Sequence, residues 1–297
     1  MAASYTLKLP PLDAPRVKAF FAERGFELGD VPYAYWQARG PGCNATFYTS
    51  GKLLLQGKEA DVYRGLLGDE TPDARPYHRA LQKQPRPPPA LWIGTDEAGK
   101  GDYFGPLVVA GVAVRREDLD VLHTLGIDDS KALADARLPE MAQGICALCR
   151  TEVLSIGPAK YNELYARIGN LNRLLAWAHG KVIENLLEAG PVDWVLIDQF
   201  AQGPTMRRAL GPLGQKVSLT ERTKAEEDPA CGAASVLARN TYLRGLAALS
   251  KKWGVRLRGG AGAPTLASGR EFLKVHGREA LNEVGKVHFA TTQQIGG

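Results

Sequence analysis

Residues 92–106 read WIGTDEAGKGDYFGP, and this stretch decides the fold of most of the chain. Residues 91–95 form an apolar run typical of a buried strand, and residues 107–114 form a second one. Asp96 and Glu97 close the first run. Because side chains alternate along a strand, both acids can face one site only if the strand stops or twists there. Such a turn is permitted by three glycines, which also let a ligand approach the backbone: Gly99, Gly101 and Gly105.

Acids also stand at the ends of two later elements. Asp198 directly follows the apolar run 192–197, where it would be rigidly held yet open to a ligand. Glu226 and its acidic neighbours precede residues 233–239, whose small side chains would let a helix pack closely on a sheet. One acid pair at a strand end is more often a turn or a cap, but three such elements favour a shared site.

Converging carboxylates point to divalent metal ions. Clustered anions repel one another, and bound cations offset that repulsion and keep the acids ionised. Oxygen ligands select Mg²⁺ or Mn²⁺ over Zn²⁺. Two such ions about 4 Å apart can activate a water on one side of a phosphodiester and stabilise the leaving oxygen on the other. The acids are therefore typical of a nuclease.

The chain divides at a proline-rich, basic segment. Residues 71–90 carry four basic residues against one acid, whereas residues 1–70 are neutral and residues 91–297 carry a net charge of +2. Repeated prolines end helices and favour extended, semi-rigid chain. We therefore predict a domain of residues 1–70, a linker of residues 71–90 and a domain of residues 91–297.

The two predicted domains differ in pattern. Strand-like and helical runs alternate after residue 90, which predicts an α/β layered domain; the strands are 91–95, 107–114, 152–156 and 194–197, and the longest helix is 172–187. Before the linker, a helix after the N-cap candidate Asp13 and a closing helix, residues 59–67, flank three strands: 33–39, 46–49 and 52–56. Such a sheet leaves one face open, either to nucleic acid or to partial burial of its aromatic residues.

Composition excludes several classes of protein. Hydrophobic residues make up 44% and charged residues 23% of the 297, and no apolar run approaches the roughly 20 residues of a membrane span. The start lacks a signal-peptide pattern, so we expect a cytoplasmic protein without a membrane partner. We interpret the four cysteines as free thiols, Cys146 and Cys149 as a structural helix face, and His179 and His288 as structural.

Several motifs resemble, in order, those of ribonuclease HIII, a bacterial type 2 ribonuclease H. The first is DEAGKGDYFGPLVVA at residues 96–110, where type HII enzymes typically have Arg at the position of Lys100. Further matches are DSK (129–131), NLNRLLAWAH (170–179), LIDQF (196–200), TKAE (223–226) and KVHFATT (286–292). Residues 49–58, TSGKLLLQGK, resemble the N-terminal extension that ribonuclease HIII has and ribonuclease HII lacks.

The resemblance implies both a fold and a site. It implies a ribonuclease H-like mixed sheet flanked by helices, preceded by a small α+β domain with a TATA-binding-protein-like fold that helps hold the substrate. It makes Asp96, Glu97 and Asp198 metal ligands and Glu226 the fourth acid, for two Mg²⁺ or Mn²⁺ ions. The segment after Glu226 is one residue shorter than the family pattern and begins with Glu227, so Glu227 remains the alternative.

The resemblance also implies residues that contact nucleic acid. Three residues match the glycine-basic-glycine loop that contacts the 2′-hydroxyl of the cut strand: Gly99, Lys100 and Gly101. Contacts to phosphates are expected from Lys131, Asn172 and Arg173. For these last three, the alternatives are a loop or cap at Lys131 and a solvated helix face at the other two.

The expected activity is endonucleolytic hydrolysis of the RNA strand of RNA/DNA hybrids by two metal ions, leaving 3′-hydroxyl and 5′-phosphate ends. We expect the protein to act as a monomer. One alternative is incision at single ribonucleotides embedded in duplex DNA, as in ribonuclease HII. Another is a non-catalytic nucleic-acid-binding module that keeps the fold.

Overall fold

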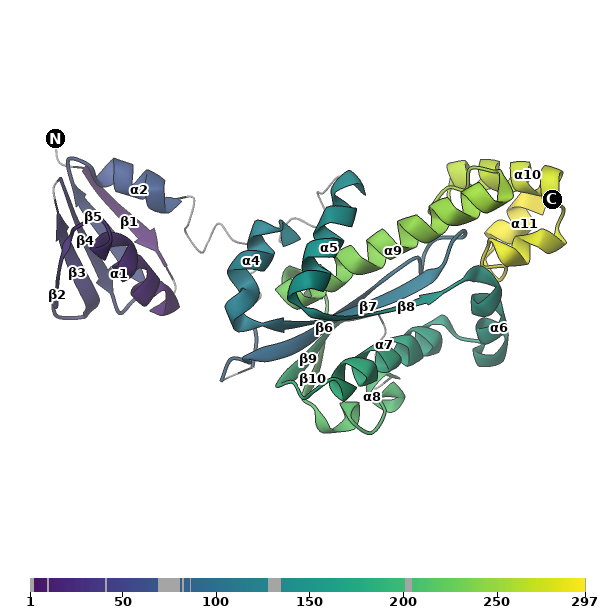
Figure 1. The fold of residues 1–297 in the computed structure, drawn as a ribbon, viewed down its shortest axis with the longest axis horizontal. Coiled ribbons are helices and arrows are strands. Elements are labelled where there is room, and N and C mark those ends of the chain that lie inside the picture. Colours follow the sequence, from purple (N-terminus) through teal and green to yellow (C-terminus); the bar gives the residue numbers. More distant parts are fainter. Residues whose placement is uncertain are drawn as a thin grey trace. The chain divides into compact units, whose positions relative to one another are not determined.

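The structure, a computed structural model, describes residues 3–9, 11–40, 42–68, 81, 83–85, 87–127, 135–200 and 205–296 (Figure 1). The chain forms two compact units, residues 1–82 and 83–297. Most of the predicted linker, 71–90, lies outside the described residues, so the division into 1–70, 71–90 and 91–297 stays a prediction. In the described part of the chain, no helix is long and apolar enough to span a membrane.

The first unit is a small α+β fold, as predicted. Its elements are β1 (Ala3–Lys8), η1 (Pro11–Asp13), α1 (Ala14–Ala22), β2 (Glu27–Gly29), β3 (Ala34–Gly40), β4 (Cys43–Tyr48), β5 (Lys52–Gly57) and α2 (Ala60–Gly68). The strands form one antiparallel sheet in the order β1-β5-β4-β3-β2. Strand β1 and the three-residue β2 were not predicted from the sequence, and Asp13 precedes α1 without the expected side-chain cap.

One face of this sheet carries the core. Trp36 and Phe47 are buried against the helices, with Phe21 of α1 among their neighbours. Tyr33 and Tyr35, in contrast, are 86% and 41% exposed. Within β3, Tyr35 and Trp36 thus lie on an accessible and a packed face, whereas Tyr33 lies in the turn before the strand.

The second unit is an α/β layered fold, as predicted. Its strands are β6 (Leu91–Ala98), β7 (Leu107–Arg115), β8 (Arg150–Ile156), β9 (Trp194–Asp198) and β10 (Leu219–Arg222). Its α-helices are α4 (Leu119–Thr124), α5 (Leu138–Leu148), α6 (Pro158–Ile168), α7 (Leu171–Glu188), α8 (Thr205–Ala209), α9 (Pro229–Trp253), α10 (Ala263–His276) and α11 (Thr291–Gly296). Its 3₁₀ helices are η3 (Arg116–Asp118), η5 (Asp135–Arg137), η6 (Gly214–Lys216), η7 (Ala225–Glu227) and η8 (Glu279–Glu283).

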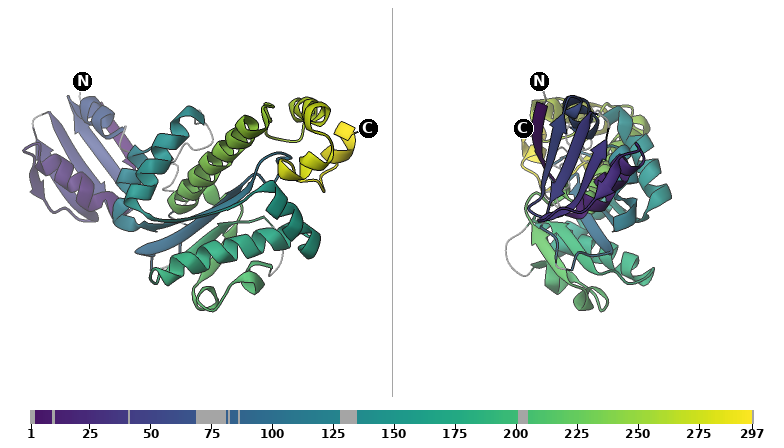
Figure 2. Two further views of the ribbon diagram at one scale, coloured as in Figure 1. Left: turned by 45° about the vertical axis from the view of Figure 1, so that its right-hand side comes forward. Right: turned by 90° about the vertical axis from the view of Figure 1, so that its left-hand side faces the viewer.

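A mixed sheet forms the middle layer of this unit. The strand order is β10-β9-β6-β7-β8; β6 pairs parallel with β9 and antiparallel with β7. Helices α5 and α9 cover one face, and α7 and α8 cover the other (Figures 1 and 2). Sequence analysis missed β10, whose sequence LTER has only four residues and two charges.

Helix α9 packs on the sheet through small residues, as expected. Gly94 of β6 faces this helix, and a Cβ added at Gly94 would overlap the backbone of Ala230 and Cys231. All four cysteines are free, and Cys149 directly follows α5. The end of the predicted linker belongs to this unit. Gln84 is buried; its side-chain N–H donates a hydrogen bond to Asp228, and its side-chain oxygen accepts one from Arg116.

We predict that Gly94→Ala destabilises the second unit, because the new methyl group meets helix backbone that cannot rotate away. Overpacking of this kind costs about 1–3 kcal/mol, which lowers the unfolding midpoint by about 2–12 °C in a unit of this size. Calorimetric unfolding of the full chain measures it. Gly157→Ala is the control, since a Cβ at Gly157 meets nothing within 4 Å. Equal midpoints for the two variants would contradict the packing described.

Candidate active site

The pairing of β6 with β9 sets two acids side by side. Thr95 pairs with Ile197 in parallel register, and Asp96 and Asp198 are the next residues on each strand. The strands before them are buried, whereas both acids are half-buried. Asp198 is oriented by the backbone N–H of Ala225, which donates to its Oδ1 over 3.0 Å.

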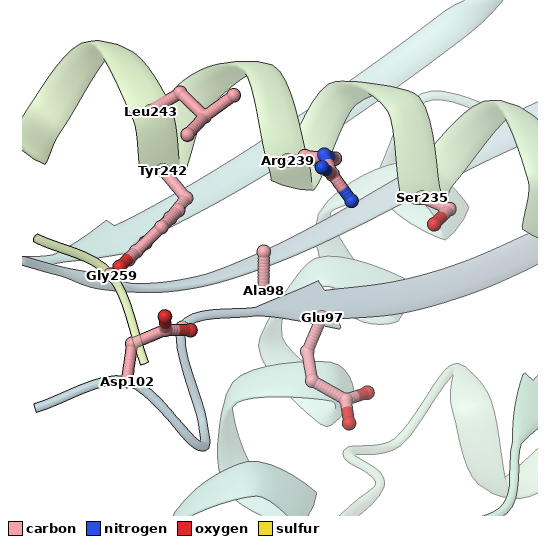
Figure 3. A pocket seen from close by; sticks show the side chains of 9 residues that line it. Glu97, Ala98, Asp102, Ser235, Arg239, Tyr242, Leu243 and Gly259 are labelled. Carbon is pink, nitrogen blue, oxygen red and sulfur yellow. The ribbon is translucent and has the colours of Figure 1, made fainter. Parts of the chain in front are cut away.

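Asp96 and Glu97 point to opposite faces of the sheet. The strand does not stop at these acids, which was one of the two ways in which both could face one site; β6 continues to Ala98. Asp96 accepts a hydrogen bond from Ser235 of α9, whereas Glu97 contacts His179 of α7. Figure 3 shows Glu97 directed away from α9. Strand alternation therefore divides the contacts of the two neighbours between the faces, but both carboxylates lie at the end of the strand, within the field of Lys100.

Glu97 is held by two nitrogen groups. His179 is buried; its Nε2 donates to Glu97 Oε2 over 3.2 Å, and its Nδ1 lies 2.8 Å from the Thr95 hydroxyl. Lys100 Nζ lies 2.6 Å from Glu97 Oε1. Burial opposes ionisation, but the His179 hydrogen bond and the charges of His179 and Lys100 outweigh it and lower the pKa of Glu97 to about 2. Glu97 is therefore an oriented carboxylate.

Burial and neighbouring negative charges both raise the pKa values of the other two acids. Burial and the charge of Glu97 raise the pKa of Asp96 to about 7. The pKa of Asp198 is also raised, by burial and by the charges of Glu226 and Glu97. Burial opposes the charge of Lys100, but the fields of Glu97, Asp96 and Asp198 raise its pKa above the usual value. The Lys100 ammonium thus acts as a counter-charge for three acids.

The segment after β10 separates Glu226 from Glu227. Lys224 adopts a left-handed conformation, φ +57°, just before η7. Glu226 acts on Asp198 electrostatically, whereas Glu227 accepts a hydrogen bond from Lys83 over 3.1 Å. Buried Asp228 caps α9 through Ala230 N–H. Each of the three consecutive acids therefore has a different environment.

The glycine loop after β6 is closed by left-handed glycines. Gly99 and Gly105 have φ values of +88° and +87°, and the turn is closed by Asp102 N–H donating to the Gly99 carbonyl over 3.3 Å. Between these glycines, Lys100 and Gly101 are exposed. A Cβ added at Gly101 would meet nothing within 4 Å, so this part of the loop is open to a ligand.

A pocket of about 390 Å³ lies beside this loop (Figure 3). Its lining includes Glu97 and Gly99, and α9 contributes Ser235, Arg239 and Tyr242. Sequence analysis did not select these three α9 residues. Their spacing of four and three positions places them on one helix face, and this periodicity was the available signal. His179, interpreted as structural, proves to be the partner of Glu97.

The other predicted contact residues are more dispersed. Asn172 and Arg173 are exposed in the first turn of α7, where Arg173 N–H bonds the capping side chain of Asn170. Lys131 lies outside the described residues. The roles predicted for these side chains stay predictions.

The donor set suits a hard divalent cation. Within the described ranges, no three His, Cys, Asp or Glu side chains converge closely enough to hold a metal ion as they stand. Glu97 is turned toward His179 and Lys100, which explains this spread. The ammonium of Lys100 lies where three carboxylates, those of Asp96, Glu97 and Asp198, favour a positive charge. The oxygen atoms of these acids are the ligands that Mg²⁺ and Mn²⁺ prefer.

Comparisons with known proteins agree with this fold. Residues 93–292 match the family model described as Ribonuclease HII, and residues 21–74 match a domain of unknown function, DUF3378. A Ribonuclease HIII from Protochlamydia amoebophila is 39% identical over 274 residues, covering 92% of this chain and 90% of that protein. A Ribonuclease HIII from Chlamydia abortus is 36% identical over 299 residues, covering 99% and 98%.

A solved structure extends the likeness to three dimensions. The crystal structure of Bst-RNase HIII in complex with Mn²⁺ matches with a TM-score of 0.65 at 27% identity, covering 99% of this chain and 98% of that one. This match confirms the ribonuclease H-like fold predicted from the sequence. By sequence and by structure, over nearly its whole length, the chain belongs to the ribonuclease HIII family.

Proposed function

We propose that this protein is a ribonuclease H that hydrolyses the RNA strand of RNA/DNA hybrids with two divalent metal ions, leaving 3′-hydroxyl and 5′-phosphate ends. One observation carries the proposal: the parallel pairing of β6 with β9 sets Asp96 beside Asp198 at the end of a buried sheet, next to Glu97 and its partner Lys100. The family membership and the Mn²⁺ complex of a relative support the same assignment.

Asp96, Glu97, Asp198 and Glu226 are the residues that would hold Mg²⁺ or Mn²⁺. When bound, such ions activate a water and stabilise the leaving oxygen of a phosphodiester. The protein supplies orientation: His179 fixes Glu97, and the N–H of Ala225 fixes Asp198. Lys100 carries the charge that a metal would supply, so we propose that it leaves Glu97 when the site is loaded.

The exposed tip of the glycine loop supports recognition of ribose. We propose that Gly99, Lys100 and Gly101 contact the 2′-hydroxyl, the group that distinguishes RNA from DNA. We assign phosphate contacts to Lys131, Asn172 and Arg173. The last two are exposed near the start of α7, which supports that assignment. The accessible sheet face of the first unit, with Tyr35, is the proposed additional surface for the hybrid.

We also propose the physiological context. We propose that the monomer is the active form. The relatives are bacterial, and hybrids in bacteria form in the cytoplasm, where we place the protein. The domain limits 1–70 and 91–297, with the linker 71–90, complete the proposal.

Cleavage of three matched duplexes tests the function. We expect the RNA/DNA hybrid to be cut at several positions in Mg²⁺ or Mn²⁺, a duplex with one embedded ribonucleotide to be cut less, and an all-DNA duplex not at all. EDTA should abolish cleavage because the carboxylates alone repel a phosphodiester. Asp96→Asn and Asp198→Asn are the matched controls; both should bind the hybrid without cutting it.

Other results of this cleavage assay would indicate a different function. Preferred incision at the single ribonucleotide would favour an activity like that of ribonuclease HII. Salt-sensitive binding of the hybrid without cleavage in either metal would identify a binding module. Full turnover by Asp198→Asn would contradict the metal mechanism.

The fourth acid can be identified separately. Glu226→Gln should reduce turnover by about 100-fold or more, because losing a metal ligand removes several kcal/mol of transition-state stabilisation. Glu227→Gln loses only an exposed pair with Lys83, worth at most about 1 kcal/mol, so its turnover should stay within about fivefold. Single-turnover cleavage of the hybrid measures both. The reverse order of the two defects would assign the role to Glu227.

A further inference from the structure

Lys286 is a fully buried lysine that bonds one short segment of the glycine loop. Its Nζ donates to the carbonyls of Asp102 and Gly105, each over 2.8 Å. Its backbone N–H donates to the carbonyl of Tyr103, also over 2.8 Å. One residue, far away in sequence, thus holds three carbonyls within four consecutive positions of the loop.

A lysine at this position needs a physical reason. In the described part of the chain, the hydrogen bonds of Lys286 Nζ go to two carbonyls rather than to a carboxylate, and a buried ammonium without an ion-pair partner is costly. Burial lowers the pKa of Lys286 to about 7, and the Asp102 carboxylate offsets only part of that effect. A methionine would fill similar space without this cost. Even a neutral amine retains two N–H groups, which matches the two carbonyls.

The bonds of Lys286 fix one half of the loop and leave the other half exposed. Backbone hydrogen bonds also hold residues 103–105: Tyr103 N–H donates to the Gly260 carbonyl, and Gly105 N–H donates to the Val284 carbonyl. The Asp102 carboxylate accepts a hydrogen bond from Gly260 N–H. Lys100 and Gly101 precede this fixed half and are exposed. The position of the exposed tip therefore depends on the base beneath it.

The segment that carries Lys286 is itself fixed to α6. Asn162 accepts from Val287 N–H over 3.1 Å and donates to the Gly285 carbonyl over 2.9 Å. Tyr161 is fully buried, and its ring lies 5.5 Å from Lys286 Nζ. Lys286 thus connects the loop to a packed helix.

We propose that Lys286 is a positioning residue for substrate selection: it holds the 102–105 segment so that Gly99–Gly101 keep the conformation that accepts a ribose 2′-hydroxyl. This inference rests on the proposed function. Lys286 does not contact substrate in this account; it acts through the loop.

The test compares two equilibrium affinities in Ca²⁺, which slows cleavage: one for an RNA/DNA hybrid and one for a DNA duplex of the same sequence. Lys286→Met removes the donors and preserves the side-chain length. Lys160→Met is the matched control, because Lys160 is an exposed lysine of α6 paired only with its neighbour Glu163. Hydrogen exchange of peptides spanning residues 97–106 reports the loop directly.

Lys286→Met should lose about tenfold in hybrid affinity, the scale of one lost polar contact to substrate, and leave DNA affinity within about twofold. Hydrogen exchange should accelerate in the loop. Lys160→Met should change neither the hybrid affinity nor the hydrogen exchange of the loop. A folded Lys286→Met with an unchanged preference for the hybrid would overturn the inference, as would an equal loss for both duplexes.

Two further results separate the possible failures. If Lys286→Met does not fold, Lys286→Gln decides, since it keeps a shorter amide donor; a partial loss of preference supports the inference and an unchanged preference overturns it. If the unmodified protein itself neither cuts nor prefers the hybrid, the proposed function fails, whatever Lys286 does.

Discussion

Strands β6 and β9 run parallel with Thr95 beside Ile197, so Asp96 and Asp198 emerge together from an apolar sheet. Two carboxylates in such surroundings repel each other strongly, because little water screens them. Burial is the largest cause of the raised pKa values of both acids, and the charges of neighbouring carboxylates add to it: Glu97 at Asp96, and Glu226 and Glu97 at Asp198. Lys100 and the Ala225 N–H relieve part of it within the protein. The proposed metal ions would relieve the rest.

The surrounding architecture fixes these charges in place. Gly94 lets α9 approach β6 closely, which brings Ser235 to Asp96. On the opposite face, α7 delivers His179 to Glu97. Lys286 then fixes the base of the loop that carries Lys100. Helices on both faces of the sheet thus contribute to one small site, and this explains why its parts are widely separated in sequence.

Sequence patterns predicted the parts of this arrangement that depend on long apolar runs. The strands before Asp96 and Asp198 and the helix α7 are of this kind. Short elements such as β2 and β10 were missed because three or four residues carry too little periodicity. The His179–Glu97 contact could not be predicted, because it depends on how a helix packs on a strand 82 positions away. The separate environments of Glu226 and Glu227 likewise depend on the turn at Lys224.

The central claim is that the end of the β6–β9 pair holds divalent metal. Anomalous diffraction from a crystal of the protein soaked in Mn²⁺ tests it most directly. We predict anomalous density bounded by oxygens of Asp96, Glu97 and Asp198, with the Lys100 ammonium displaced from Glu97. Density elsewhere only, with Lys100 still paired to Glu97 at saturating Mn²⁺, would contradict the account.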